Sequence, residues 1–112
     1  MSLLVFFQEY PVMQFVIRAL DGEGMLAKRL EVRPRHLEGM AALGRHIVCA
    51  GGLLDAEGKM KGSVIVVEFP SREDVSEYIS HEPYFVEHVW EKIEVEPINV
   101  ALVKGEKYVY EP

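Results

Sequence analysis

His36 is the side chain whose type and position best suit chemistry near neutral pH. Imidazole takes up and releases a proton in this range, which makes histidine the usual general acid or base. Arg33 precedes His36 by three residues, so on a helix both side chains project to the same side. A guanidinium there would hold a carboxylate while the imidazole moves a proton. The alternative is an ordinary histidine on a helix surface.

Four other residues could form the walls of a binding pocket. Gly51 and Gly52 allow a ligand to approach the backbone and its N–H groups, although they could instead mark a β-bulge. The Ser63 hydroxyl could donate a hydrogen bond to a substrate oxygen, or bond to the backbone at a strand end. Tyr84 could close the pocket with its ring or simply belong to the core.

The remaining patterns predict neither a metal site nor a nucleophile. His81 and His88 lie two helical turns apart, about 10 Å, which is too far for a shared metal. Cys49 lies in an apolar stretch, where cysteine is usually inert. The serines lack a Gly-x-Ser-x-Gly elbow, and the chain has neither a phosphate loop nor a dinucleotide fingerprint. We therefore expect no metal and no cofactor.

Alternating strand and helix patterns must position these candidates. In the first helix, Leu30 and Leu37 belong to the apolar stripe, and His36 borders it. Pro34 implies either two helices or one kinked helix, with the longer part starting at the proline. The predicted elements are strand 13–19, helix 25–45, strand 46–54, strand 62–69, a helix whose N-cap is Ser71, a short helical segment 84–90 and strand 93–103.

This order of elements predicts an α+β fold of the ferredoxin-like βαββαβ type. Such a fold has one antiparallel sheet with both helices on one face. The other face must also be covered, because the strand at 62–69 is apolar on both sides. A second copy of the chain is the simplest cover, so we expect a homodimer.

Length and charge restrict the class of protein further. The 112 residues suffice for one domain with a real core. Acidic residues outnumber basic ones 18 to 12, and this net charge of −6 repels nucleic acid. The single cysteine fits a reducing cytoplasm, and no apolar run reaches the roughly 20 residues of a membrane helix.

The regular pattern divides the chain into three parts. Residues 1–12 are apolar but lack the basic start of a signal peptide, so they form either a docking arm or a poorly ordered tail or misassigned start. We expect the domain at residues 13–104. Residues 105–112 form a tail whose alternating stretch at 107–110 could add a strand.

Five short motifs together resemble the YciI-like (YCII-related) family. The helix segment KRLEVRPRHL, residues 28–37, is similar to that family's helix motif, and Gly62-Ser63 opens the third strand similarly. Ala50-Gly51-Gly52 resembles Ala-Gly-Pro, Glu82-Pro83-Tyr84 resembles Asp-Pro-Tyr/Phe, and Val95-Glu96-Pro97 resembles Val-x-Pro. The resemblance extends from about residue 13 to residue 99 and implies a dimeric α+β barrel of ferredoxin-like subunits.

The resemblance also implies a small pocket that holds a paired histidine and carboxylate. In this chain the pair would be His36 and Glu82, with Glu where the family has Asp. A carboxylate that accepts from one imidazole nitrogen sets the tautomer and supports the charged ring. An acid directly before Pro83 is equally suited to cap the next helix, so both roles for Glu82 stay open.

Three functions are compatible with these features. The first is a cofactor-free lyase, isomerase or dehalogenase acting on a small anionic or cyclic molecule, the chemistry that the resemblance implies. In that enzyme His36 would be the acid/base, Glu82 its orienting partner and Arg33 the anion anchor. The second is a ligand-binding module without turnover, and the third is a dimeric interaction domain. The changes at Gly52 and Glu82 favour the second and third slightly.

Overall fold

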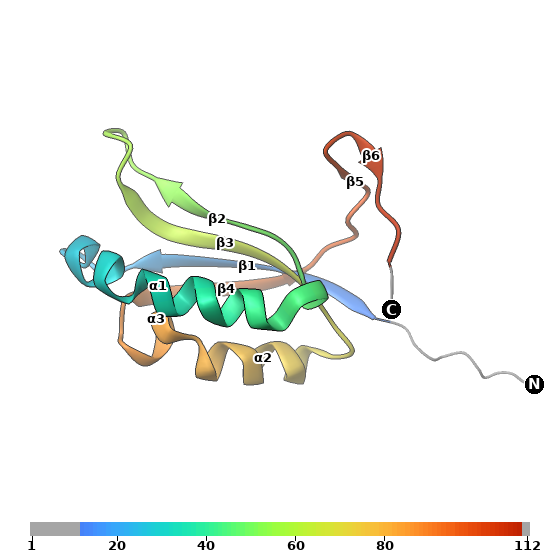
Figure 1. Cartoon of the computed structure of the whole chain (residues 1–112), viewed down its shortest axis with the longest axis horizontal. Helices are drawn as coiled ribbons and strands as arrows, with labels where there is room; N and C mark the ends of the chain where they lie inside the picture. Colours follow the sequence, from blue (N-terminus) through green and yellow to red (C-terminus); the bar gives the residue numbers. More distant parts are fainter. Residues whose placement is uncertain (1–11, 111–112) are drawn as a thin grey trace, which may run out of the picture.

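The structure, a computed structural model, describes residues 12–110 of the chain. Its main sheet is formed by β1 (Met13–Asp21), β2 (Ile47–Leu54), β3 (Met60–Phe69) and β4 (Trp90–Pro97). The strand order is β2-β3-β1-β4, and every neighbouring pair is antiparallel. The helices α1 (Leu26–Leu43) and α2 (Arg72–His81) lie on the same side of the sheet (Figure 1). The predicted α+β, ferredoxin-like fold is therefore confirmed.

The strand register brings distant parts of the chain together at one end of the sheet. Ala19 in β1 pairs with Ser63 in β3 and with Ile93 in β4. Two residues further along β1, after a shift in the register, Asp21 lies opposite Trp90. This end of the sheet therefore carries polar side chains from β1, β3 and β4, and it faces the first half of α1.

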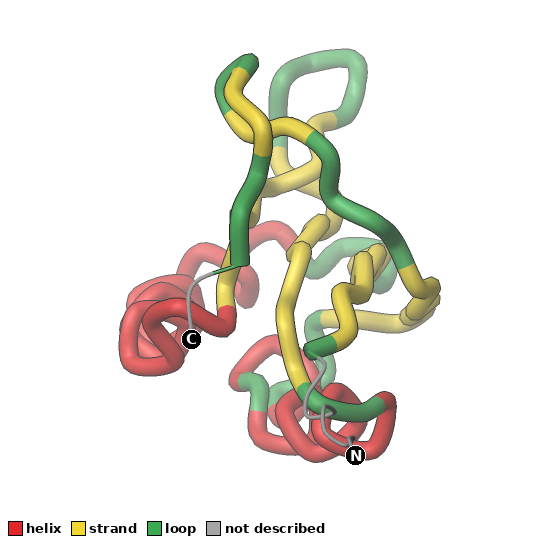
Figure 2. The backbone as a smooth tube through the Cα atoms, turned by 90° about the vertical axis from the view of Figure 1, so that its right-hand side faces the viewer, coloured by secondary structure: helices red, strands yellow, loops and turns green. Residues whose placement is uncertain are grey.

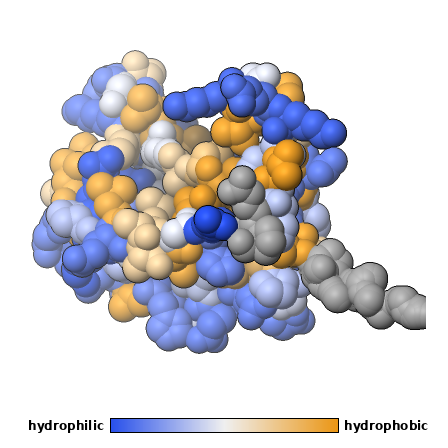
Figure 3. Space-filling view, turned by 45° about the vertical axis from the view of Figure 1, so that its right-hand side comes forward, coloured by the Kyte–Doolittle hydropathy of each residue, from blue (hydrophilic) through white to orange (hydrophobic). Residues whose placement is uncertain are grey.

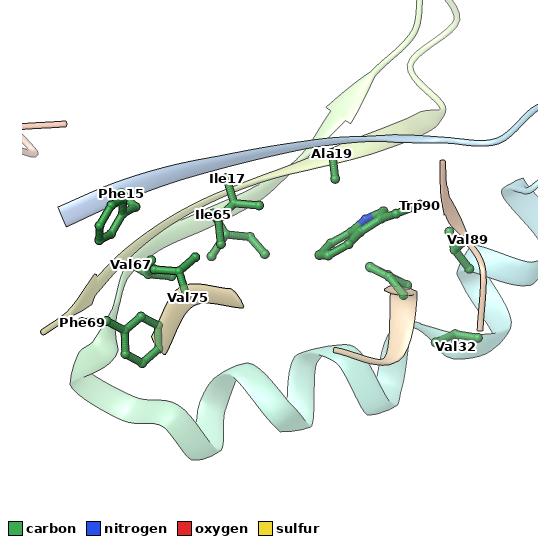
Figure 4. Packing of buried hydrophobic residues seen from close by; sticks show 11 residues of the cluster. Phe15, Ile17, Ala19, Val32, Ile65, Val67, Phe69, Val75, Val89 and Trp90 are labelled. Atoms are coloured by element: carbon green, nitrogen blue, oxygen red, sulfur yellow. The ribbon is translucent and has the colours of Figure 1, made fainter. Parts of the chain in front are cut away.

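The core lies between the helices and the inner face of the sheet. Alternate residues of the two central strands point toward the helices, among them Ile17 and Ile65, which are fully buried (Figure 4). Val32 from α1 and Val75 from α2 close the layer from the other side. Gly62 permits the tight packing of β3 against β1, because a Cβ at this position would lie 2.4 Å from the Ala19 carbonyl oxygen.

The first helix matches its prediction only in part. Of the two alternatives that Pro34 implies, the structure has the single helix, which contains the proline. The predicted apolar stripe is wrong, because Leu30 and Leu37 are 51% and 41% exposed. The inner face of α1 instead buries Arg29, Val32 and His36. These residues follow helical spacing, but two of the three are polar and find partners inside the protein.

The predicted second half of the chain is partly correct. Ser71 caps α2 as predicted, since its side chain accepts a hydrogen bond from the backbone N–H of Asp74. The short helix α3 ends earlier than predicted and spans Pro83–Val86, and the predicted strand 93–103 is replaced by β4, which starts at Trp90 and ends at Pro97. A separate small ladder joins β5 (Leu102–Val103) to β6 (Glu106–Lys107). The tail thus adds a strand, although at the start of the predicted segment.

The helices leave the other face of the main sheet open. The tube in Figure 2 places the helices on one side of the strands, while the β5–β6 hairpin projects beyond the sheet. On the face drawn in Figure 3, hydrophilic residues dominate the lower edge, whereas hydrophobic residues gather across the middle. Among the described residues, none of the helices is long and apolar enough to cross a membrane. The extension predicted at residues 1–12 lies outside the described residues, apart from Val12.

Candidate active site

His36 and Glu82 form a buried pair beneath α1. The imidazole Nδ1 lies 2.9 Å from Oε1 of Glu82, and the two residues are 4% and 2% exposed. An ionised carboxylate only accepts hydrogen bonds, so Nδ1 is the donor of this pair. That tautomer leaves Nε2 as the ring nitrogen that can take up a proton.

Glu82 also caps the short helix α3. Its Oε1 accepts a second hydrogen bond from the backbone N–H of Tyr84, at 2.9 Å, and Pro83 occupies the first helical position. From the sequence, histidine partner and helix cap are alternative roles for Glu82. The structure places one carboxylate oxygen in both positions at once, because the cap fixes the side chain where it meets His36.

Aromatic rings hold the imidazole in place. The ring of Tyr84 stacks on His36 with centroids 4.1 Å apart and an interplanar angle of 22°. Trp90 approaches His36 edge-on at 6.5 Å. The guanidinium of Arg29 lies over the Tyr84 ring, 4.4 Å from its centroid, in a cation–π contact. The Tyr84 ring therefore contacts both the imidazole of His36 and the guanidinium of Arg29, and it links these two groups of the site.

Arg29 is the buried cation of the site. Its Nη1 donates to both carboxylate oxygens of Asp21, at 2.8 and 3.0 Å, and its Nη2 donates to Ser63 Oγ at 2.7 Å. Trp90 Nε1 donates to the same Ser63 oxygen at 3.3 Å. Burial raises the pKa of the Asp21 carboxyl, and the neighbouring Arg29 charge opposes that shift without overcoming it.

Two buried polar atoms of this cluster have no hydrogen-bond partner among the described residues. They are Nε of Arg29 and the hydroxyl oxygen of Tyr84. Burial raises the pKa of the Tyr84 hydroxyl, so this group remains protonated and can donate. Buried donors are usually satisfied in proteins. A ligand or a water molecule that supplies an acceptor oxygen would satisfy both.

A cavity of about 90 Å³ lies next to these groups. This volume is far below the range of about 300–1,000 Å³ that is usual for pockets of drug-sized ligands, so the cavity suits a small molecule. Its walls come from α1, β2, the start of β3 and α3, and the lining residues are Arg29, Arg33, His36, Leu37, Met40, Ala50, Gly51, Gly52, Met60 and Tyr84.

Most of the predicted site residues meet at this cavity. His36, Arg33, Gly51, Gly52 and Tyr84 line it. Tyr84 belongs both to the core and to the cavity wall, so its two alternatives are compatible. The other two predicted residues stand one layer behind, where Glu82 supports the imidazole and Ser63 accepts from Arg29. Neither alternative for Ser63, a substrate donor or a backbone bond, corresponds to that contact.

Sequence reasoning missed Arg29, Asp21 and Trp90. Arg29 precedes His36 by seven residues, two helical turns, so the two share one face of α1. That spacing was a usable signal. The partners Asp21 and Trp90 come from neighbouring strands, and only the register of the sheet brings them to Arg29.

A second, larger hollow lies between α1 and α2. This groove has a volume of about 520 Å³ and includes Phe69, Tyr78 and the carboxylates Asp74, Glu77 and Glu82 in its lining. It touches the His36–Glu82 pair, the dyad, only through Glu82. The smaller cavity is the candidate active site, because His36, Arg29 and Arg33 line it.

Curated relatives extend over most of this chain. Protein YciI of Escherichia coli O6:H1 is 33% identical over 96 residues, which covers 78% of this chain and 97% of that protein. Aspercryptin biosynthesis cluster protein B of Emericella nidulans is 31% identical over 80 residues. That match covers 63% of this chain and 51% of the fungal protein.

Solved structures with the same fold include an enzyme. The 5-chloro-2-hydroxyhydroquinone dehydrochlorinase of Burkholderia phenoliruptrix, in complex with 2,5-dihydroxybenzoquinone, aligns with a TM-score of 0.74 and 25% identity. The alignment covers 78% of this chain and 94% of the dehydrochlorinase. An antibiotic biosynthesis monooxygenase-type protein from Bacteroides thetaiotaomicron covers 88% of this chain and 96% of its own, with a TM-score of 0.53 and 13% identity, and shares the fold alone.

The family model of the YCII-related domain matches residues 13–99. This segment contains all four strands of the main sheet, both long helices and every residue of the cavity. The match agrees with the relationship to protein YciI and with the ferredoxin-like fold. The chain therefore belongs to the family of YCII-related domain proteins.

Proposed function

We propose that this protein is a cofactor-free enzyme of the lyase, isomerase or dehalogenase kind that acts on a small anionic, cyclic molecule. The observation that carries the proposal is the buried His36–Glu82 pair beside a cavity lined by two arginines. A general base, its orienting carboxylate and an anion anchor are sufficient for proton-transfer chemistry.

His36 is the group that moves the proton in this proposal. Its Nε2 removes a proton from the substrate, and the electron pair released forms a new double bond as the leaving group departs with its own pair. The imidazolium that results is supported by Glu82 through Nδ1. In an isomerisation the same imidazolium returns the proton to another atom of the substrate. Neither course needs an external oxidant or reductant.

The ligand is proposed to present an anionic oxygen to Arg29, Arg33 and Tyr84. The unpartnered Nε–H of Arg29 and the Tyr84 hydroxyl are both donors, so they select an acceptor. Charge-assisted hydrogen bonds of this type are short and strong. Phenolate or enolate oxygens on a single ring fit this donor set. The dehydrochlorinase with the same fold was solved with a dihydroxybenzoquinone, which carries such oxygens.

The test titrates the protein with 2,5-dihydroxybenzoquinone as the probe. Binding is monitored through the absorbance of the quinone. We expect saturable binding by the wild type and binding about tenfold weaker in Arg33→Met, because one charged contact is lost. Arg35→Met is the matched control. Arg35 is exposed on the same helix and pairs with Glu87, so its loss leaves binding unchanged.

Turnover is tested by chloride release from chlorinated hydroxyhydroquinones. We expect release by the wild type and none by His36→Gln. Probe binding without any turnover would favour the ligand-binding module. Absence of probe binding, or equal affinities of the Arg33 and Arg35 variants, would contradict the proposed site.

We also propose that the protein acts as a homodimer in the cytoplasm. Half-buried Val16, Leu20 and Val64 lie on the open face of the sheet, opposite the helices, beside Val66. A second copy packed on this face would remove them from water. The exposed free thiol of Cys49 suits a reducing compartment.

A further inference from the structure

Tyr78 contacts the dyad from the side opposite the cavity. It lies in the last turns of α2, four residues before Glu82, and its hydroxyl donates to Glu82 Oε2 at 3.1 Å. Its ring is half-buried in the wall of the groove between α1 and α2. Tyr78 thus approaches Glu82 from the groove, whereas His36 approaches it from the cavity.

The two oxygens of Glu82 have different partners. Oε1 accepts from His36 Nδ1 and from the Tyr84 backbone, and Oε2 accepts from Tyr78. The terminal torsion of a glutamate side chain is broad, so a free carboxylate rotates easily about its last bond. With a donor on each oxygen, that rotation is blocked. The plane of the carboxylate is then fixed relative to the imidazole.

Tyr78 serves only as a donor in this contact. Burial raises the pKa of its hydroxyl far above the ordinary value, and the adjacent charge of Glu82 raises it further. The phenol therefore stays protonated across the physiological range and does not carry the transferred proton itself. Its effect on His36 must pass through Glu82.

We propose that Tyr78 is a positioning residue that locks the Glu82 carboxylate and thereby selects the Nδ1–H tautomer of His36. Its catalytic meaning rests on the proposed function, since this tautomer leaves Nε2 as the proton acceptor of a ring that lines the cavity. Glu82 is longer by one methylene than the aspartate of the family pattern. The Glu82 carboxylate meets His36 and Tyr78 while it also caps α3.

The test is the tautomer of His36 in the ligand-free protein, measured by imidazole ¹⁵N NMR. The chain has four histidines, and the spectrum of His36→Gln identifies the signal. We expect the wild type to be almost entirely the Nδ1–H form. In Tyr78→Phe the ratio of the two tautomers should change about fivefold toward Nε2–H, as expected for the loss of one hydrogen bond to the orienting group.

Tyr84→Phe is the matched control, because it also removes a phenol hydroxyl beside His36. That hydroxyl makes no hydrogen bond to Glu82, so the tautomer ratio should stay at the wild-type value. An unchanged ratio in Tyr78→Phe, or an equal change in both variants, overturns the proposal. This outcome is independent of whether the quinone probe binds, so failure of the proposed function is recognised separately.

A second measurement applies if Tyr78→Phe does not fold. In the wild type, a hydroxyl proton donated to a buried carboxylate exchanges slowly with water, and we expect a resolved Tyr78 Oη–H signal in cold buffer. Fast exchange of that proton would contradict the lock.

Discussion

A single carboxylate organises the site at the scale of residues. Glu82 is 2% exposed and accepts from an imidazole, a phenol and a backbone N–H. A buried carboxylate is tolerated when its lone pairs are occupied in this way. The cap of α3 and the orientation of His36 are therefore one structural feature.

Substitutions at Glu82 separate these contributions. Glu82→Ala removes the cap and leaves the His36 and Tyr78 donors without their partner, so we expect it to lower the free energy of unfolding by about 2–4 kcal/mol. Glu82→Asp keeps an efficient capping residue but withdraws the carboxylate by one C–C bond, about 1.5 Å. We expect Glu82→Asp to lower the free energy of unfolding by less than half as much as Glu82→Ala, although it breaks the hydrogen bond to Tyr78. Urea unfolding curves measure both values. Equal losses in the two variants would show that the cap contributes little.

Which site residues could be predicted from the sequence depended on the chemistry of each side chain. In the sequence, residue type and family motifs indicate His36 and Glu82, and helical spacing indicates Arg33. Arg29 was overlooked because a charged residue on a helix normally faces water. Its spacing from His36 indicates a shared helix face, but its burial depends on Asp21 in β1. An ion pair between a strand and a helix leaves no periodic signal of its own in the sequence.

Element boundaries depend on contacts that local patterns do not contain. The alternating pattern continues past Pro97, yet β4 ends there. The backbone N–H of Ile98 bonds to the carbonyl of Gln14, and that of Val100 bonds to the Gln14 side chain. These bonds anchor the segment after β4 to β1 without continuing the strand. The wrong prediction for the apolar stripe of α1 has a similar origin. The inner face of this helix carries Arg29 and His36, whose partners Asp21 and Glu82 come from other elements.

Pro34 provides a prediction about an element. A proline inside a helix lacks the N–H that would bond to the carbonyl four residues earlier, here that of Leu30. Pro34→Ala restores this donor, so we expect the free energy of unfolding to rise by about 1–3 kcal/mol, measured by urea unfolding. Ser71→Ala serves as a control of opposite sign, since loss of that cap costs about 1 kcal/mol. A lower stability of Pro34→Ala would mean that the proline ring makes packing contacts that outweigh the missing bond.

The open face of the sheet dominates the argument at the scale of the whole molecule. Both long helices cover one side (Figure 1). The other side presents valines and leucines, interrupted by the Arg18–Glu94 ion pair. The sequence alone predicted this asymmetry, because the third strand is apolar on both faces. The register then assigns the faces: Val67 is fully buried beneath the helices, while Val66, which is 8% exposed, pairs with Val16 on the opposite face.

Val66→Asp tests whether a second copy covers the open face. We expect the wild type to be a dimer with more than about 1,000 Å² of total buried surface. An aspartate at the centre of that interface would be desolvated without a partner, so the variant should become monomeric or aggregate. Light scattering at micromolar concentrations measures the mass, and circular dichroism reports whether the fold is retained.

Two further variants make the dimer test specific. Val64→Asp places the charge at a half-buried position on the same face and should have the same effect, even if Val66→Asp folds poorly. Leu30→Asp places it on α1, at a hydrophobic residue that is 51% exposed, and should leave the dimer intact. A monomeric wild type would exclude the sheet-to-sheet dimer, as would a dimer that persists in both valine variants. The hydrophobic residues of the open face would then need a different cover, because Val16, Val64 and Val66 lie side by side on β1 and β3.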